Sequence, residues 1–435
     1  MTMLLPSTNV AQTLAERRRS LRATAIGNAL EWFDWTLYTT FSAYLALQFF
    51  DPSDPTSALL STFAIFAVGF LMRPLGGWFF GWLGDRRGRK VAMIATMLLL
   101  AFTSVAIAVT PSYEAIGVWA SVLLLFWRLL QGLAYGGETG VAYTYAAELA
   151  PPDKRAFWSS SIFVSVMIGV MAATGLAAVL TSVLSTEDME AWGWRVGFAI
   201  GGVLGIYAMI LRRSAGESDV FEKARTATGP EVRSLTRRDI LRMSARIIMI
   251  AAFAQVGFYI WVAFPPAFAI ATKGMDPQGA YIAGLLAQAI AVFWLPICGI
   301  MADKFGRKRM LAIYGVGVVL AVVPVSMILG SQPWTLFVSL LVGLLVWCLC
   351  SSMFPAILSE QVPTFARART VGMVSSVSAA LFGGTAPYLN TWLSSIGLEW
   401  IFHIYLMGLG ALALIAAFVI KETKGVPLDE IGTSR

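Results

Sequence analysis

The sequence predicts an all-α integral membrane protein with twelve transmembrane helices, arranged as two similar halves of six. Three observations lead to this fold class. Of the 435 residues, 57% are hydrophobic and 13% are charged, with a mean hydropathy of +0.72, whereas a soluble globular protein carries about 25% charged residues. Long apolar runs recur along the chain, and a ten-residue motif occurs twice.

Twelve apolar runs are long enough to cross a bilayer, which takes about 20 helical residues. The short alternating strands of a membrane barrel are not found, so the runs are predicted to be helices. The first six lie at 23–50, 58–83, 91–110, 115–147, 156–183 and 194–211, and the second six at 247–271, 278–302, 309–330, 333–360, 369–396 and 399–420. The pair Pro265-Pro266 should break or kink the seventh.

A repeat at about half the chain length indicates the two halves. The motif GWLGDRRGRK at 81–90 returns 218 positions later as GIMADKFGRK at 299–308, each time between one apolar run and the next. Glu148 and Glu360, at the ends of the fourth and tenth runs, are each followed by proline and basic residues. This pattern predicts bundles at 1–211 and 247–420, a linker at 212–246 and a short tail at 421–435.

The distribution of basic residues predicts the orientation. If the N-terminus is cytoplasmic, the tails and the even-numbered loops hold 28 of the 32 Lys and Arg residues, and the opposite loops are acidic. By the positive-inside rule, both termini are expected in the cytoplasm, with the chain spanning the cell (inner) membrane many times. Topology thereby explains the net charge of +7, and no nucleic-acid partner is expected.

Other classes of function are disfavoured. Cys298, Cys348 and Cys350 fall in apolar runs without the spacing of metal ligands. The single histidine, His403, leaves no His/Asp, Cys/His or metal constellation from which a membrane enzyme could be built. We expect no enzyme activity, no metal and no cofactor, with the proton gradient as driving force, and a monomer in the bilayer.

Five of the ionisable residues inside predicted spans matter most for function, because such a residue costs about 2.5–3.5 kcal/mol at the bilayer centre and is usually functional. At about 1.5 Å per residue, three of them on separate helices are expected near mid-membrane, the level at which transporters bind substrates. The three are Asp34, Arg73 and Arg128, and the other two are Glu31 and Glu138.

Helical spacing groups these residues into polar faces. Glu31, Asp34 and Tyr38 share one face of the first span. The fourth span carries one polar stripe within about 80° of helix circumference, which consists of Arg128, Gln131, Tyr135 and Glu138. Small residues let helices approach closely, and the same span contains Gly132 and Gly136. Gln255 and Tyr259 precede the proline pair of the seventh span and are candidates for a cavity wall.

Two interpretations of the arginines stay open. Arg73 and Arg128 could neutralise Asp34 or Glu138 and hold helices together. Alternatively, they could bind an anionic substrate, because guanidinium pairs with carboxylate through two hydrogen bonds. Burial raises a carboxylate's affinity for a proton, and a nearby arginine lowers it. The carboxylates are therefore candidates for proton coupling, because arrival of the substrate could shift this balance. Which of Glu31, Asp34 and Glu138 carries the proton is not evident.

At this point the chain resembles the metabolite:proton symporter family of the major facilitator superfamily. The stretches that carry the resemblance are GNALEWFDW at 27–35, FLMRPLGG at 70–77 and RLLQGLAYGGE at 128–138. Further stretches, EAIGVW at 114–119, ALFGGTA at 380–386 and SIGLE at 395–399, are similar to members that take up α-ketoglutarate.

The resemblance implies uptake of a small carboxylate with protons, α-ketoglutarate or a related dicarboxylate first. Arg73 and Arg128 also occur in members that take zwitterions, so citrate, shikimate, aromatic acids, proline and betaine stay open. Because they match family motif positions, the resemblance carries over the roles of Arg73 and Arg128 in binding and of Glu31, Asp34 and Glu138 in proton coupling. From their places on the helices, the further predicted binding residues are Tyr38, Gln131, Tyr135, Gln255 and Tyr259. A drug:proton antiporter is disfavoured, because the fifth span has no Gly-Pro motif at 166–175.

The repeated loop motifs carry a separate expectation. Asp85 could cap the helix that follows it or pair with a basic residue of the fourth or fifth span, with Arg155 as a candidate, and the basic residues could anchor to lipid headgroups. Plain topology signalling is the simpler explanation. The resemblance implies instead a conformational latch made of Gly81, Asp85, Arg86, Gly88, Arg89, Glu148 and Arg155, and of Gly299, Asp303, Gly306, Arg307 and Glu360.

Overall fold

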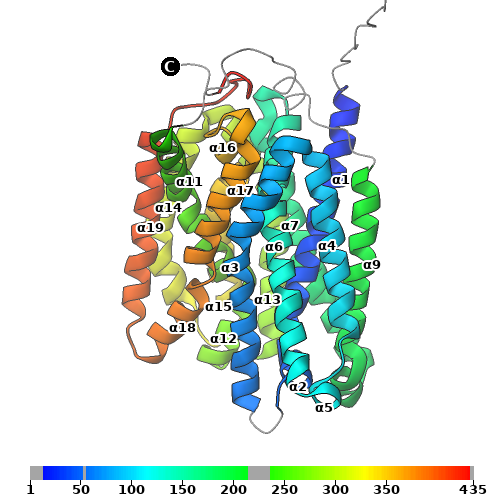
Figure 1. Cartoon of the computed structure of the whole chain (residues 1–435). Coiled ribbons are helices and arrows are strands. Elements are labelled where there is room, and N and C mark those ends of the chain that lie inside the picture. Colours follow the sequence, from blue (N-terminus) through cyan, green and yellow to red (C-terminus); the bar gives the residue numbers. More distant parts are fainter. Residues whose placement is uncertain (1–12, 52–54, 214–235, 432–435) are drawn as a thin grey trace, which may run out of the picture.

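Helices make up nearly all of the residues that the structure, a computed structural model, describes, which are 13–51, 55–213 and 236–431. The long helices run side by side along one axis, and no strand occurs within these ranges (Figure 1). We call 13–213 the first half and 236–431 the second half.

The first half begins with a helix whose Arg-rich first turn extends beyond the apolar run. Thr13 and Glu16 form a capping box there, which satisfies the first backbone N–H groups of the helix. The long helices are α1 (Leu14–Thr40), α3 (Pro55–Arg87), α4 (Arg89–Val109), α6 (Val118–Leu149), α7 (Arg155–Val183) and α9 (Trp194–Arg213). The short ones are α2 (Ser42–Phe49), α5 (Tyr113–Ile116), η1 (Pro152–Lys154), α8 (Thr186–Asp188) and η2 (Met189–Gly193).

The second half repeats this pattern with interruptions. Its helices are α11 (Arg237–Phe258), α12 (Pro265–Lys273), α13 (Pro277–Phe305), α14 (Arg307–Ile328), α15 (Pro333–Ser351), α16 (Phe354–Ser359), α17 (Arg367–Ser378), α18 (Ala386–Ser395) and α19 (Glu399–Val419). Two π-helical turns, η3 (Tyr259–Ala263) and η5 (Ala379–Gly383), continue α11 and α17, and the short 3-10 turn η4 (Thr364–Ala366) precedes α17.

The predicted spans coincide with these helices, which confirms the all-α membrane fold class. Nine helical segments of the described chain are long and apolar enough to cross a bilayer. The other three predicted spans coincide with α1, with α3 and with the interrupted run from α17 to α18. As predicted, the seventh span is broken at the proline pair, because Pro265 and Pro266 start the new helix α12.

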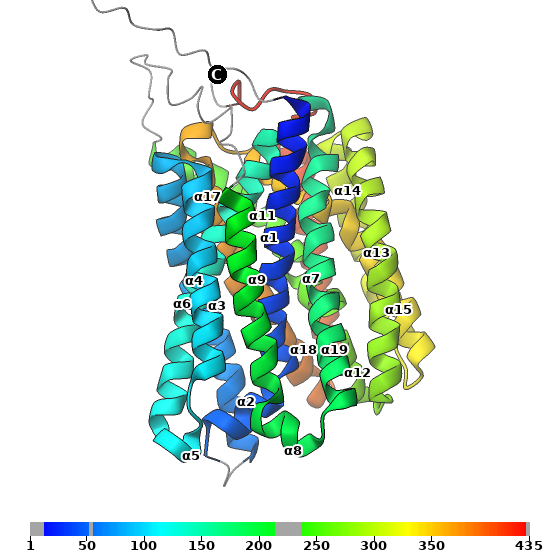
Figure 2. The same ribbon diagram turned by 90° about the vertical axis from the view of Figure 1, so that its right-hand side faces the viewer.

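The two ends of the bundle differ. The α3–α4 and α13–α14 connections, the start of α1 and the segment after α19 lie together at the upper end in Figure 1, which we call the basic end. The short helices α2, α5 and α8 lie at the opposite end (Figures 1 and 2). The halves meet along α3 with α17 and along α7 with α13, whereas α1 packs between α7 and α9 inside the first half.

Glycines bring α3 and α6 into close contact, as the sequence predicts. A Cβ atom on Gly132 would lie 2.1 Å from the carbonyl oxygen of Gly69, and one on Gly136 would lie 1.9 Å from that of Arg73. No larger residue fits without moving a helix backbone. This contact fixes the depth of Arg73 relative to the polar stripe of α6.

Candidate functional site

A chain of hydrogen bonds links three helices in the middle of the first half. The Arg128 Nη1 atom donates to Gln131 Oε1 at 2.8 Å, and Gln131 Nε2 donates to Asp34 Oδ2 at 3.0 Å. The hydroxyl of Ser104 on α4 donates to the other oxygen, Asp34 Oδ1. All four side chains are buried. The amide of Gln131 therefore connects a buried cation to a buried carboxylate.

The two predicted arginines stack on one tryptophan. The guanidinium carbon of Arg73 lies 4.2 Å from the ring centroid of Trp35, and that of Arg128 lies 4.3 Å from it. Arg128 also lies 4.0 Å from the Tyr38 ring, whose hydroxyl donates to the carbonyl of Thr62. These cation–π contacts bring the cations together at similar depth.

Arg73 faces a different environment from Arg128. It lies 4.2 Å from the Phe70 ring and 5.4 Å from the Tyr135 ring, and the hydroxyl of Tyr259 from the second half lies against its guanidinium. Its Nε and Nη2 atoms, although buried, have no hydrogen-bond partner within the described part of the chain. Arg73 is thus the predicted cation that stands at the boundary between the halves.

Glu31 and Tyr135 join the same cluster. Glu31 is buried, and its backbone carbonyl accepts a hydrogen bond from the Tyr135 hydroxyl. The Tyr135 ring lies 4.5 Å from the ring of Trp35. The side chain of Glu138, the third predicted proton carrier, lies outside the part of the chain that the structure describes.

Two members of the cluster were not anticipated. Ser104, on α4, donates a hydrogen bond to Asp34 on α1. The hydroxyl of Tyr143 lies near enough to Glu31 and Arg73 to interact with their charges. A serine in an apolar run gives no signal in the sequence. Tyr143 could have been found, because it stands on α6 eight residues after Tyr135, at the edge of the predicted polar stripe.

The second half contributes an aromatic wall. The Tyr259 ring lies 5.7 Å from the ring of Phe70, and Phe258 lies 4.8 Å from Trp32, so each pair joins the two halves. Gln255 is half-buried on α11, one turn before Tyr259, and its carbonyl packs beside Gly383 of η5. The structure therefore brings Tyr259 to Arg73 and leaves Gln255 one turn nearer the basic end.

A cavity of about 340 Å³ adjoins this cluster on the side of the opposite end. It lies between α1 and α7 of the first half and η3, α12 and α13 of the second. Its lining is largely aromatic and hydroxylic, with Trp32, Trp35, Thr36, Tyr259 and Gln288 among its residues. Gln288 Nε2 donates to the Val262 carbonyl at 3.0 Å, which satisfies a backbone group at the break in the seventh span. The volume suits a small metabolite.

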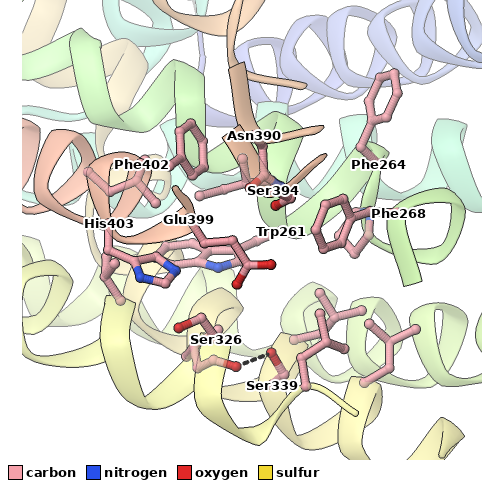
Figure 3. A pocket seen from close by; sticks show the side chains of 18 of the residues that line it. Trp261, Phe264, Phe268, Ser326, Ser339, Asn390, Ser394, Glu399, Phe402 and His403 are labelled. Carbon is pink, nitrogen blue, oxygen red and sulfur yellow. Dashed lines mark hydrogen bonds between the residues drawn. The ribbon is translucent and has the colours of Figure 1, made fainter. Parts of the chain in front are cut away.

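A second cavity, of about 280 Å³, lies inside the second half (Figure 3). It is lined by aromatic side chains such as Trp261 and Phe402, with His403 and Glu399 at one side. Ser339 in its wall donates to the carbonyl of Val325 at 2.8 Å. This cavity contains none of the predicted binding residues.

The repeated loop motifs form a symmetric set of contacts at the basic end. Asp85 accepts hydrogen bonds from the backbone N–H groups of Ala368 and Arg369, at 3.3 and 3.0 Å, at the start of α17. Asp303 accepts from Ala156 and Phe157, at 3.0 and 2.8 Å, at the start of α7. Each carboxylate thus caps a helix of the other half, where the helix dipole favours negative charge.

Buried ion pairs complete this arrangement. Glu148 accepts from Arg89 at 3.3 Å and from Arg367 at 3.0 Å, and Glu360 accepts from Arg307 at 3.1 Å and from Arg155 at 2.6 Å. Arg89 and Arg307 also pair with the aspartate four residues before them, Asp85 and Asp303. We call Asp85, Glu148, Asp303, Glu360 and these partners the gate.

The glycines of the motifs allow the gate to close. A Cβ atom on Gly81 would lie 2.6 Å from the Cα of Arg369, and one on Gly299 would lie 2.8 Å from that of Phe157. Gly88 and Gly306 have φ of 107° and 95°, which favours glycine. Arg86 stands apart, over the Trp82 ring at 5.1 Å.

Two expectations for Asp85 were wrong. It does not cap the helix that follows it, since α4 has Gly88 as its N-cap residue and no side-chain cap, and it does not pair with Arg155. Arg155 pairs with Glu360, and Asp85 caps α17. Spacing along the chain favours local partners, whereas the folded halves bring α17 of the second half against α3.

Comparisons with known proteins agree with this geometry. Residues 24–387 match the family model described as Major Facilitator Superfamily. The chain is 34% identical over 427 residues to the alpha-ketoglutarate permease of Escherichia coli (strain K12), covering 96% of this chain and 97% of that one. It is 36% identical over 385 residues to a putative proline/betaine transporter of Staphylococcus aureus (strain COL), covering 86% and 82%.

A solved structure has the same fold. The proton:xylose symporter XylE bound to 6-bromo-6-deoxy-D-glucose superposes with a TM-score of 0.83 at 17% identity, covering 96% of this chain and 99% of that one.

Proposed function

This chain belongs to the major facilitator superfamily, and we propose that it imports a small carboxylate together with protons by alternating access. It is a transporter and not an enzyme, as its relatives and fold are those of permeases. We propose α-ketoglutarate or a related dicarboxylate as the first candidate substrate. The proposed orientation places the basic end in the cytoplasm, with both termini, in the inner membrane, following the charge distribution.

The observation that carries the proposal is that Arg73 is buried and has hydrogen-bond donors without a partner among the described residues. Arg73 is 6% exposed, and its buried Nε and Nη2 donors are unused within the described residues. It touches Trp35 and Tyr259, which line the cavity between the halves. A buried cation with unused donors favours an anion, and a carboxylate can accept two of its hydrogen bonds.

Asp34 supports the proposed proton coupling. It is a buried carboxylate joined to Arg128 through Gln131. With a proton on Asp34, the positive charge of Arg128 and Arg73 is less compensated, which favours entry of an anion beside Trp35. When the proton leaves, the negative charge of Asp34 weakens binding of that anion. This ordering would move substrate and proton in the same direction.

A zwitterionic substrate is the second candidate, for a specific reason. The cavity wall holds the rings of Trp32, Trp35, Phe258 and Tyr259, and aromatic rings attract quaternary ammonium groups. Such a ligand would place its one carboxylate on Arg73. The similarity to a putative proline/betaine transporter adds weight to this alternative.

Competition for uptake tests the proposal. Labelled α-ketoglutarate would be offered to proteoliposomes with and without an inward proton gradient, against succinate, citrate, shikimate, aromatic acids, proline and betaine. Gradient-dependent uptake blocked mainly by dicarboxylates supports the first candidate. Competition by betaine or proline alone assigns the site to the second candidate, and uptake that ignores the gradient contradicts proton coupling.

A further inference from the structure

We propose that the segment at 420–431, which follows α19, is a clasp that helps to hold the gate closed by fixing Glu360 and binding Arg155 of the first half. The inference rests on the proposed transport by alternating access, and it adds a control element that lies outside the substrate site. The segment lies across the basic end of the bundle (Figure 1).

The clasp is anchored to the second half by a helix cap. Glu422 Oε1 accepts from the backbone N–H of Arg307 at 2.9 Å, and Glu422 Oε2 accepts from that of Lys308 at 3.1 Å, at the start of α14. The ammonium of Lys424 donates to the carbonyl of Lys304 at 2.8 Å, at the end of α13. The clasp thus contacts both helices that flank the second motif loop, α13 and α14.

From this anchor the clasp reaches the gate ion pairs. The hydroxyl of Thr423 donates to Glu360 Oε2 at 2.5 Å, while Glu360 Oε1 accepts from Arg155 and Arg307. Further along, the carbonyl of Leu428 accepts from Arg367 Nη2 at 3.0 Å. Each of these contacts uses a residue that also forms a gate ion pair, Glu360 with Arg155 and Arg307, and Arg367 with Glu148.

Arg155 is the point at which the clasp touches the first half. Its Nη1 atom donates to Glu360 at 2.6 Å, and its Nη2 atom donates to the carbonyl of Val426 at 2.8 Å. Arg155 starts α7, so any separation of the halves at this end withdraws it from Glu360 and from Val426 together. The contact between Val426 and Arg155 therefore exists only while the gate is closed, and through it the clasp favours the closed gate.

Burial shows that the clasp is packed into this surface. Ile420 is 2% exposed and Leu428 is 4% exposed, although neither lies in a helix. The ion pairs of Glu360 and Arg367 that the clasp contacts are buried as well, and an ion pair is stronger where water is excluded. A contact that one state makes and the other lacks shifts the equilibrium between them.

The test is a distance measured across the gate. Arg87 and Phe365 are exposed and lie on opposite halves, so each would be replaced by cysteine and spin-labelled. The three native cysteines are buried, so the labels should attach to the introduced cysteines. Thr423→Val removes a hydrogen bond to a charged group, which should raise the ratio of open to closed gates about tenfold. Leu428→Ser should act in the same direction. Lys421→Ala, an exposed neighbour, is the matched control and should leave the distances unchanged.

The outcomes separate the clasp from the proposed function. If Leu428→Ser fails to fold, Thr423→Val decides alone. Distances that stay at the parental values in Thr423→Val overturn the clasp. If uptake by these variants is nevertheless normal and proton-dependent, the proposed transport by alternating access stands without the clasp. A gate that opens in the variants while no carboxylate is transported would leave the clasp in place and reject the proposed substrate.

Discussion

Asp85 and Asp303 stand 218 positions apart in the chain, and each caps the first turn of a helix in the opposite half. Asp85 caps α17, and Asp303 caps α7. The repeated motif therefore joins the halves reciprocally, and in this structure both copies contribute contacts that close the basic end. In this state the cavity beside Arg73 lies toward the opposite end of the bundle.

Removal of these caps should loosen the gate. Replacing a capping aspartate by alanine costs about 1 kcal/mol, so Asp85→Ala and Asp303→Ala should each favour the open gate by roughly fivefold, and the double variant by more. Spin-label distances between Arg87 and Phe365 positions report the change. Asp153→Ala, exposed at the same end, is the control. Equal distances in the double variant and the control would show that the caps do not hold the gate.

A side chain at Gly136 should prevent folding. Its Cβ atom would lie 1.9 Å from the Arg73 carbonyl, so Gly136→Val must separate α3 from α6. We expect little inserted protein, as measured by size-exclusion chromatography in detergent. Gly175→Ala is the control, because a Cβ atom there meets nothing within 4 Å. A normal monodisperse yield of Gly136→Val would contradict the close packing.

Loss of Arg128 should abolish uptake while the protein stays inserted. Arg128→Ala removes the cation that Gln131 connects to Asp34. Arg128→Lys keeps the charge but cannot reproduce the planar guanidinium on Trp35 and Tyr38, so it should retain only a small fraction of uptake. Near-normal transport by Arg128→Ala would remove this residue from the site.

Asp34 should be required for proton coupling more than for substrate exchange. Asp34→Asn keeps a hydrogen-bonding side chain for Ser104 and Gln131 but cannot exchange a proton. We expect gradient-driven accumulation to be lost, while counterflow of labelled against unlabelled substrate continues. Glu31→Gln provides the comparison. Should both variants accumulate substrate normally, the coupling carboxylate lies elsewhere, with Glu138 next in order.

Acid should release the clasp. Burial alone would raise the pKa of the Glu422 carboxyl, but hydrogen bonds from four backbone N–H groups hold this pKa below its ordinary value of 4.5. The carboxylate therefore stabilises docking fully above pH 4.5, and this contribution is lost as the pH falls through the lowered pKa. The charged groups that surround this carboxylate belong to Lys304, Arg307, Lys308 and Lys424.

The gate distance measured between pH 7 and pH 3 checks this prediction. Two steps are expected in the wild-type protein: loosening near pH 6, because burial raises the pKa of Asp85 to about 6, and further opening below pH 4.5, where Glu422 is protonated. Glu422→Gln should be more open at neutral pH and should lack the second step. An identical pH profile in both proteins would exclude Glu422 as the titrating group.

Hydropathy was sufficient to predict the long helices of the described chain, because the bilayer demands apolar length and internal hydrogen bonds. It was less able to predict where helices end. The structure extends α1 and α11 beyond the apolar runs because Thr13 and Thr236 form capping boxes with Glu16 and Asp239. Spacing on one helix was enough to group Gln131 with Arg128, since they share a face of α6.

Contacts between distant segments could not be derived in the same way. The partner of Asp85 is the start of α17, and the partner of Asp34 is Ser104, and neither relation follows from spacing along the chain. The clasp was predicted only as a short tail, because residues such as Thr423 and Leu428 have no motif of their own. Their role depends on a surface that two halves form together.

The most direct test of proton-coupled carboxylate import is substrate-driven proton entry. Proteoliposomes with a trapped pH indicator and no preset gradient would receive α-ketoglutarate outside. We predict internal acidification that follows substrate uptake, and its loss in Arg73→Ala, which removes the proposed carboxylate ligand while Gly175→Ala behaves as wild type. Uptake of the acid without acidification, or unchanged acidification in Arg73→Ala, would contradict the account.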